Sequence, residues 1–267
     1  MRPSFVLYIF IYNQNKFMDP FKMPTETISL PSTGIIYAET NPLSSGSIEM
    51  KYMTAKEEDI LTNINFIKDG TAIDKLLKSM VISSINFDDL ILGDKNAILI
   101  AARILGYGKD YQFKYTENNE QKEATIDLET IKEKVIDESL FKRGVNEFEF
   151  SLPTTSNVIT IKILTHGDEK RIDTEIKALK KAFPEKSFEV TTRLKYLITS
   201  VNGKRDTASI NSFVDNGLLV KDSRAIRNYI AKIQPDMELK YYPDQDYTRE
   251  GIEIPIGVNF FWPDYES

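Results

Sequence analysis

Alternating apolar and polar residues divide the chain into short strands and amphipathic helices. Residues 48–53 alternate with a period of two, which is typical of a half-buried strand. Thr54 and Glu57 then form a capping box, in which each side chain binds the backbone N–H of the other residue. Apolar residues continue at helical spacing as far as Gly70. We therefore expect one helix from Thr54 to Gly70.

Further helices and a hairpin complete the first half. A second helix is expected to begin at Thr71, and a third at Asp94, which we interpret as its N-cap. Residues 111–115 and 124–126 predict a pair of strands. Asp127 is expected to open one more helix.

The second half follows a similar order. Residues 148–153 and 158–164 predict a hairpin, and Thr165 with Asp168 matches a second capping box. Pro184 ends the helix that follows.

The remainder of the chain ends in a helix and two strands. An apolar stripe favours a helix over residues 190–201, although a strand also fits this segment. Asp222 is interpreted as the cap of a helix that extends to Ile233. Residues 237–242 and 252–262 predict two strands.

The two halves match one another at several points. The matching pairs are Leu30-Pro31 with Leu152-Pro153, Thr54 with Thr165, Asp94 with Asp222, and Lys114-Tyr115 with Lys240-Tyr241. Thr165 follows Thr54 by 111 residues, whereas Asp222 follows Asp94 by 128, so the repeat is irregular. An internal duplication explains the pattern, and so do two α+β domains built from the same common pieces.

These elements predict an α+β fold with two similar α+β halves, each with short strands or a hairpin packed on several helices. We place an N-terminal domain at residues 18–145 and a C-terminal domain at 146–267. Residues 1–17 form an extension whose apolar run is too short to span a bilayer and lacks the cleavage site of a secretory signal. It is either an extra edge strand or lies upstream of a true start at Met18.

Composition narrows the chemistry. The net charge of −6 argues against a broad nucleic-acid-binding surface and favours a protein partner. The absence of cysteine excludes disulfides, thiolate catalysis and cysteine-ligated metals. His166 is the single histidine and lies in neither a nucleophile elbow nor a zinc-binding motif, so we interpret it as a loop or capping residue.

Carboxylates are the remaining candidates for catalysis. Three acidic pairs occur, Glu57-Glu58, Asp88-Asp89 and Asp168-Glu169. Adjacent side chains on a helix point about 100° apart. Helix capping therefore explains two of the pairs better than a metal or acid–base site does. Gly106 and Gly108 follow a helix and lack phosphate-loop spacing. We expect no catalytic residue, metal or cofactor, with a hydrolase or transferase that uses carboxylate chemistry as the alternative.

A few residues are candidates for partner binding. Arg224 and Arg227 lie three apart on one helix face, where they would pair with carboxylates of a partner or of this chain. Phe261 and Trp262 belong to a run of aromatics that serves either core packing or a partner contact. Four lysines, at positions 177, 180, 181 and 186, make either a solvated helix face or a contact with an acidic partner.

Several of these blocks together resemble the T4-type bacteriophage baseplate hub protein family. The blocks are Leu30-Pro31-Ser32-Thr33-Gly34, Met53 to Leu61, Gly93 to Arg103, Tyr107-Gly108, Asp222-Ser223-Arg224 and Phe260-Phe261-Trp262-Pro263. The resemblance covers roughly residues 28–263. It implies a non-catalytic hub subunit or assembly chaperone that binds other phage baseplate hub or tail proteins. Such a protein is expected in the host cytoplasm during assembly, after which it either stays in the virion baseplate or leaves it.

The resemblance also bears on the two predicted hairpins. Some relatives carry Cys-x-x-Cys pairs there, whereas the matching places near Tyr115 and Tyr242 lack cysteine. It therefore implies that side-chain packing alone, by tyrosine and phenylalanine rings, holds the hairpins of this chain.

Overall fold

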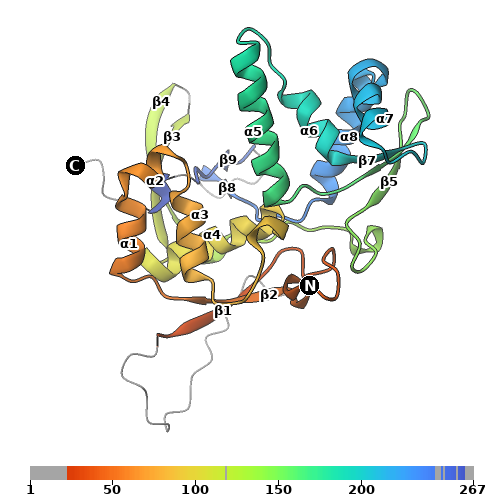
Figure 1. Ribbon diagram of the computed structural model, residues 1–267. Helices are drawn as coiled ribbons and strands as arrows, with labels where there is room; N and C mark the ends of the chain where they lie inside the picture. The colour runs from red at the N-terminus through yellow and green to blue at the C-terminus, as the bar shows by residue number, and fades with distance from the viewer. Residues whose placement is uncertain (1–22, 118, 244–247, 249, 257, 262–267) are drawn as a thin grey trace.

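Two successive sets of strands and helices make up the structure (Figure 1). It is a computed structural model that describes residues 23–117, 119–243, 248, 250–256 and 258–261. The first set comprises β1 (Thr25–Ser29), β2 (Ser47–Lys51), α1 (Ala55–Thr62), α2 (Ile64–Lys68), α3 (Ala72–Met80), α4 (Leu92–Tyr107), β3 (Asp110–Glu117) and β4 (Glu120–Asp127). The extension predicted at residues 1–17 lies outside the described residues.

The second set has the same general order. It comprises β5 (Phe148–Ser151), β6 (Val158–Ile161), α5 (His166–Ala182), α6 (Glu189–Leu197), β7 (Ile198–Val201), α7 (Thr207–Ser212), the π-helical turn η5 (Phe213–Gly217), α8 (Val220–Ile233), β8 (Lys240–Tyr241), β9 (Ile252–Glu253) and the short helix η7 (Val258–Phe261). The mixed α+β class predicted from the sequence is confirmed. The predicted domain boundary at residue 146 stays a prediction.

Each set begins with an antiparallel hairpin to which a later segment returns. In the second set, β7 pairs with β6 to make the sheet order β5-β6-β7. In the first set, Val81 forms a bridge with Met50 of β2 at the end of α3, and Ile82 donates to Glu49. A long helix and a second hairpin then follow in both sets. The similarity of the halves therefore extends from sequence to topology.

The interpretation of Asp94 and Asp222 as helix N-caps is wrong, because neither residue lies at the N-cap position of its helix. α4 begins at Leu92 and α8 at Val220, which puts both aspartates at the third helical position, where they are fully buried. Asp94 accepts hydrogen bonds from the backbone N–H and the hydroxyl of Ser32, at 2.9 and 2.7 Å.

Asp222 does the same in the second half, where it accepts from the backbone N–H groups of Thr154 and Thr155, at 2.8 and 3.1 Å. Ser32 and Thr154 each directly follow a Leu-Pro pair. In both halves a buried carboxylate therefore ties the Leu-Pro turn to the start of a long helix.

The two capping boxes are confirmed and have an additional partner. Glu57 accepts from the N–H of Thr54, and Asp168 from that of Thr165. Both carboxylates also bind a lysine six residues earlier, Lys51 at 2.8 Å and Lys162 at 2.9 Å. Each box therefore also joins its helix to the strand or loop before it.

Three predicted helices differ from the structure. The helix expected over 54–70 breaks at Asn63, whose side chain accepts from the N–H groups that begin α2. Asp127 caps only a three-residue turn, Leu128–Thr130, and not a longer helix. The segment 190–201 is helical as far as Leu197, and its last residues form β7. In each case hydrogen bonding at the end of a segment overrides its apolar periodicity.

Contacts between aromatic rings connect the β3–β4 hairpin with the β8–β9 hairpin. These are the two hairpins that we expected side-chain packing to hold. The ring of Tyr241, on β8, lies 5.5 Å from that of Phe113 and 5.7 Å from that of Tyr115, both on β3. Tyr111 makes an edge contact with Phe260 at 4.7 Å and donates its hydroxyl to the carbonyl of Pro255. The hairpin of the first half therefore packs directly on the C-terminal segment.

Candidate functional site

Arg224 and Arg227 lie on the exposed face of α8. Val220, one turn before Arg224, is 82% exposed. Because these residues are spaced by four and then three positions, they form one stripe along the helix. Within the described residues neither arginine takes part in an ion pair; the Nε of Arg227 donates only to the carbonyl of Ser223, at 3.4 Å. The stripe, which we call the α8 face, thus has cationic groups that the described chain leaves unneutralised.

The opposite side of α8 is buried, and this burial orients the α8 face toward solvent. Ile226 and Ile233 are buried, and the ring of Tyr229 stacks on that of Phe150 at 4.6 Å. Burial would raise the pKa of Asp222, but hydrogen bonds from Thr154 and Thr155 outweigh it and hold the pKa below its usual value. An anion in the first turn of a helix is also stabilised by the helix dipole. α8 is therefore held firmly by its first turn.

Phe261 does not lie at a surface. It is fully buried beside Phe260, with ring centres 5.4 Å apart, in the short helix η7. The sequence left core packing and a partner contact open for Phe261, and in the structure this side chain packs in the core. The strand predicted through residue 262 is reduced to β9, and Trp262 lies outside the described residues.

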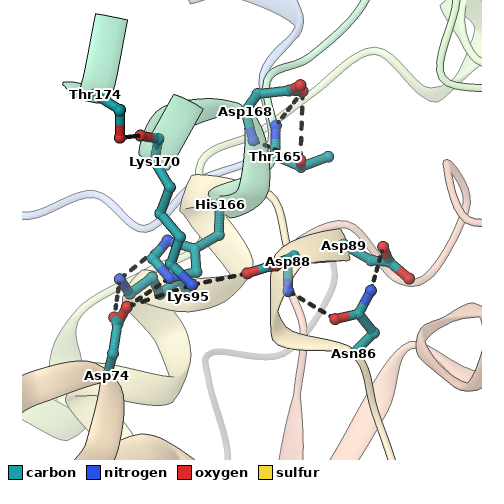
Figure 2. A network of polar contacts seen from close by, with 10 residues as sticks. All are labelled: Asp74, Asn86, Asp88, Asp89, Lys95, Thr165, His166, Asp168, Lys170 and Thr174. Atoms are coloured by element: carbon teal, nitrogen blue, oxygen red, sulfur yellow. Dashed lines mark hydrogen bonds and ion pairs between the residues drawn. The ribbon is translucent and has the colours of Figure 1, made fainter. Parts of the chain in front are cut away.

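His166 joins a polar network between the two halves that the sequence did not predict (Figure 2). Its Nε2 lies 2.8 Å from Oδ2 of Asp74, and its Nδ1 lies 3.3 Å from Nζ of Lys95. Lys95 also contacts Asp74, at 2.7 Å. Lys170 extends the network to Asp88, at 2.8 Å. The five side chains come from α3, the segment before α4, α4 itself and α5.

Backbone contacts reinforce this junction. The N–H of His166 donates to the carbonyl of Leu90 at 2.6 Å, and Thr165 forms a bridge with Ile91. At Gly167 a side chain would bring its Cβ to within 2.9 Å of Cβ of Asp88, so the close approach requires glycine. Burial would raise the pKa of Asp74, but the contacts with His166 and Lys95 outweigh it and hold the pKa far below its usual value. The network therefore has a permanent anion at its centre.

An aspartate beside a histidine also occurs in acid–base catalysis, but the surroundings differ here. A catalytic dyad of this kind activates a nearby hydroxyl or thiol. The side chains bonded to His166 are instead a carboxylate and an ammonium group. Two hollows lie elsewhere: one of about 630 Å³ beside β7 and α7, and one of about 330 Å³ between α5 and α6. The geometry of the network is that of a joint between two halves.

The acidic pairs separate into buried and exposed members. Glu57 and Asp168 are buried and bonded to lysines, whereas Glu58 is exposed. Among the residues that the structure describes, no three histidines or carboxylates are grouped so that they could hold a metal ion. In the same part of the chain, no helix combines the length and apolar character needed to cross a membrane.

Comparison with known proteins fixes the class. Residues 23–205 match a family model described as T4 bacteriophage base plate protein, so this is a phage baseplate protein. The match spans more than half of the chain, and the chain therefore belongs to the T4 bacteriophage base plate protein family. Comparison with curated proteins and with solved structures gave no match. The junction lies inside the matched segment, and α8 lies beyond it.

Proposed function

We propose that this protein is a non-enzymatic component of the central hub of the baseplate, acting as a hub subunit or an assembly chaperone. In this role it binds other hub and tail proteins. The observation that carries the proposal, in a chain of this family, is the α8 face, with the exposed Val220 and two arginines that form no ion pair with any residue the structure describes.

The α8 face has the features of a protein-binding surface. An exposed apolar side chain beside arginines combines desolvation with directed hydrogen bonding, and arginine is enriched at interfaces. The guanidinium group binds carboxylates in a two-point geometry that lysine cannot copy. Because Asp222 and the buried side of α8 hold the helix in place, little conformational entropy is lost when a partner binds. We expect the partner to present carboxylates to Arg224 and Arg227.

The buried carboxylates support a structural role. Glu57 accepts hydrogen bonds from Lys51, Thr54 and Ser79. Asp168 and Asp222 are likewise engaged by neighbouring side chains and backbone groups. A carboxylate that already accepts several hydrogen bonds is poorly placed to exchange protons with a substrate.

The test is recovery of partners from infected cells. Tagged full-length protein is purified late in infection and the co-purifying proteins are identified by mass spectrometry. We expect hub and tail proteins with the wild type and their loss with R224E/R227E. The matched control is K56E/K142E, which reverses two exposed lysines that are not part of α8 and changes the net charge equally.

The same experiment separates the two roles. A hub subunit is present in purified virions, whereas a chaperone is found only in infected cells. Recovery of a metabolic enzyme or small-molecule pathway protein, with no hub or tail protein, would overturn the proposal. The carboxylate-based hydrolase or transferase would then be the function to pursue.

A further inference from the structure

The connection between α5 and α6 forms a projecting tip with exposed apolar side chains. α5 rises from the junction and turns into α6 at its far end (Figure 1). Phe183 is 52% exposed and Val190 is 46% exposed. The ring of Phe183 lies 6.0 Å from that of Phe188, so the two aromatics form a small cluster at the end of the hairpin. We call residues 176–190 the α5–α6 tip.

The charge of this tip opposes that of the whole protein. Residues 176–190 contain four lysines and two glutamates, a formal charge of +2 in a chain with a net charge of −6. Lys177, Lys180, Lys181 and Lys186 are all exposed. Within the described residues none of the four forms an ion pair, although other lysines, including Lys162 and Lys195, do. The lysines are therefore available to a partner.

A hollow of about 330 Å³ lies within the tip. Ile176, Pro184 and Phe188 give it apolar walls, and Lys180 and Lys186 also line it. Two carboxylates, Glu185 and Glu189, also line it. The guanidinium of Arg193 lies 3.1 Å from Glu189 and offsets its charge, so the two lysines outweigh the remaining carboxylate of Glu185. The volume is at the lower end of the range of ligand pockets, and fits one or two anchoring side chains.

We propose that the α5–α6 tip is a docking surface for an acidic amphipathic segment of another protein. Apolar side chains of that segment would enter the hollow and cover Phe183, while its carboxylates would meet the four lysines. Such a segment uses apolar anchors spaced along a helix together with charges on its flanks. The inference rests on the proposed function in that the partner is taken to be a phage protein, but the surface is separate from the α8 face.

The occupant is identified first by photo-crosslinking in infected cells. A photoreactive phenylalanine analogue replaces Phe183 in the full-length chain, and the crosslinked peptide is sequenced by mass spectrometry. We expect one acidic segment with apolar residues at helical spacing. The matched control carries the analogue at Val135, which is 90% exposed and lies in another part of the chain, and should not capture that segment. Crosslinks only to a second copy of this chain, to lipid or to nucleic acid, or no specific crosslink, would overturn the inference.

Binding of a synthetic peptide with the captured sequence then tests the chemistry. We expect K180E/K181E and Phe183→Ser each to weaken binding by about 10-fold or more, and K56E/K142E to change it by less than about 2-fold. Added salt should weaken wild-type binding, since the lysines are exposed. All substituted positions are exposed, so thermal unfolding should be unchanged. Equal affinity of wild type and both tip variants would overturn the inference.

Two further readouts keep the alternatives apart. Binding of wild type to vesicles of phosphatidylcholine and phosphatidylglycerol, lost in the tip variants, would assign the tip to a lipid surface and overturn the inference. If the tip variants still recover the same hub proteins as wild type, and no peptide binds, only this inference fails. If wild type recovers no hub or tail protein, the proposed function fails.

Discussion

The hydroxyl of Tyr37 donates a hydrogen bond to Oδ2 of Asp94 at 2.5 Å, inside the core of the first half. The same hydroxyl accepts from the N–H of Ile91, just before α4. Asp94 is fully buried, and its other hydrogen bonds come from Ser32. Burial raises the pKa of Asp94 from 3.8 to about 6, because the hydrogen bonds from Tyr37 and Ser32 only partly offset the loss of hydration. The carboxylate of Asp94 therefore connects the turn at Ser32, the side chain of Tyr37 and the start of α4.

This raised pKa predicts an unusual dependence of stability on pH. The folded state binds the proton of Asp94 more tightly than the unfolded state does. The contribution of Asp94 to the free energy of unfolding is therefore complete below about pH 4 and is lost as the pH rises through about 6. The stability difference between wild type and Asp94→Asn should fall by up to about 3 kcal/mol over this range. Urea unfolding at a series of pH values measures it, and a difference independent of pH would contradict the prediction.

Glu57 is expected to behave in the opposite way. Burial would raise its pKa, but hydrogen bonds from Lys51, Ser79 and Thr54 outweigh it and lower the pKa from 4.5 to about 2. Its stabilisation is present above about pH 4.5 and is lost as the pH falls toward 2. Glu57→Gln should cost about 2–3 kcal/mol at pH 7. The cost should shrink in acid, whereas the exposed neighbour variant Glu58→Gln should change stability by less than about 0.5 kcal/mol.

The junction predicts coupling between Asp74 and His166. A double-mutant cycle with Asp74→Asn and His166→Asn should give an interaction free energy of about 1 kcal/mol or more. Hydrogen exchange should speed up at the first amides of α5, because the N–H of His166 bonds to Leu90 across the junction. The exposed pair Lys170–Asp88 provides the comparison, with a coupling of about 0–1 kcal/mol. A zero coupling for Asp74 and His166 would mean that this network does not join the halves.

The aromatic contacts predict that the two hairpins lose stability together. Phe113→Leu keeps an apolar side chain but removes ring contacts with Tyr111, Tyr115 and Tyr241. We expect a loss of about 1–1.5 kcal/mol. Hydrogen exchange should rise in both β3 and β8, since the cluster connects them. A rise confined to β3 would show that β8 is held by other contacts.

The sequence by itself determined the local features of this protein. The capping boxes at Thr54 and Thr165 were predicted correctly because each is formed by residues three positions apart. The hairpins at residues 110–127 and 148–161 followed from period-two alternation, which depends only on neighbouring residues. The α+β class followed from these elements, and the blocks of the family resemblance could be recognised along the chain.

Features that depend on contacts between residues distant in the sequence could be found only in the tertiary structure. Asp94 and Asp222 fit the pattern of N-caps, but their partners lie 62 and 68 residues away, and burial with those partners set a different role. His166 contacts Asp74, which lies 92 residues earlier in the chain, and no local pattern in the sequence indicates this contact. Phe261 is buried because η7 packs into the core, which the run of aromatic residues in the sequence does not show. The physical reason is the same in each case: local hydrogen bonds are encoded by spacing, whereas burial is decided by which distant segments meet.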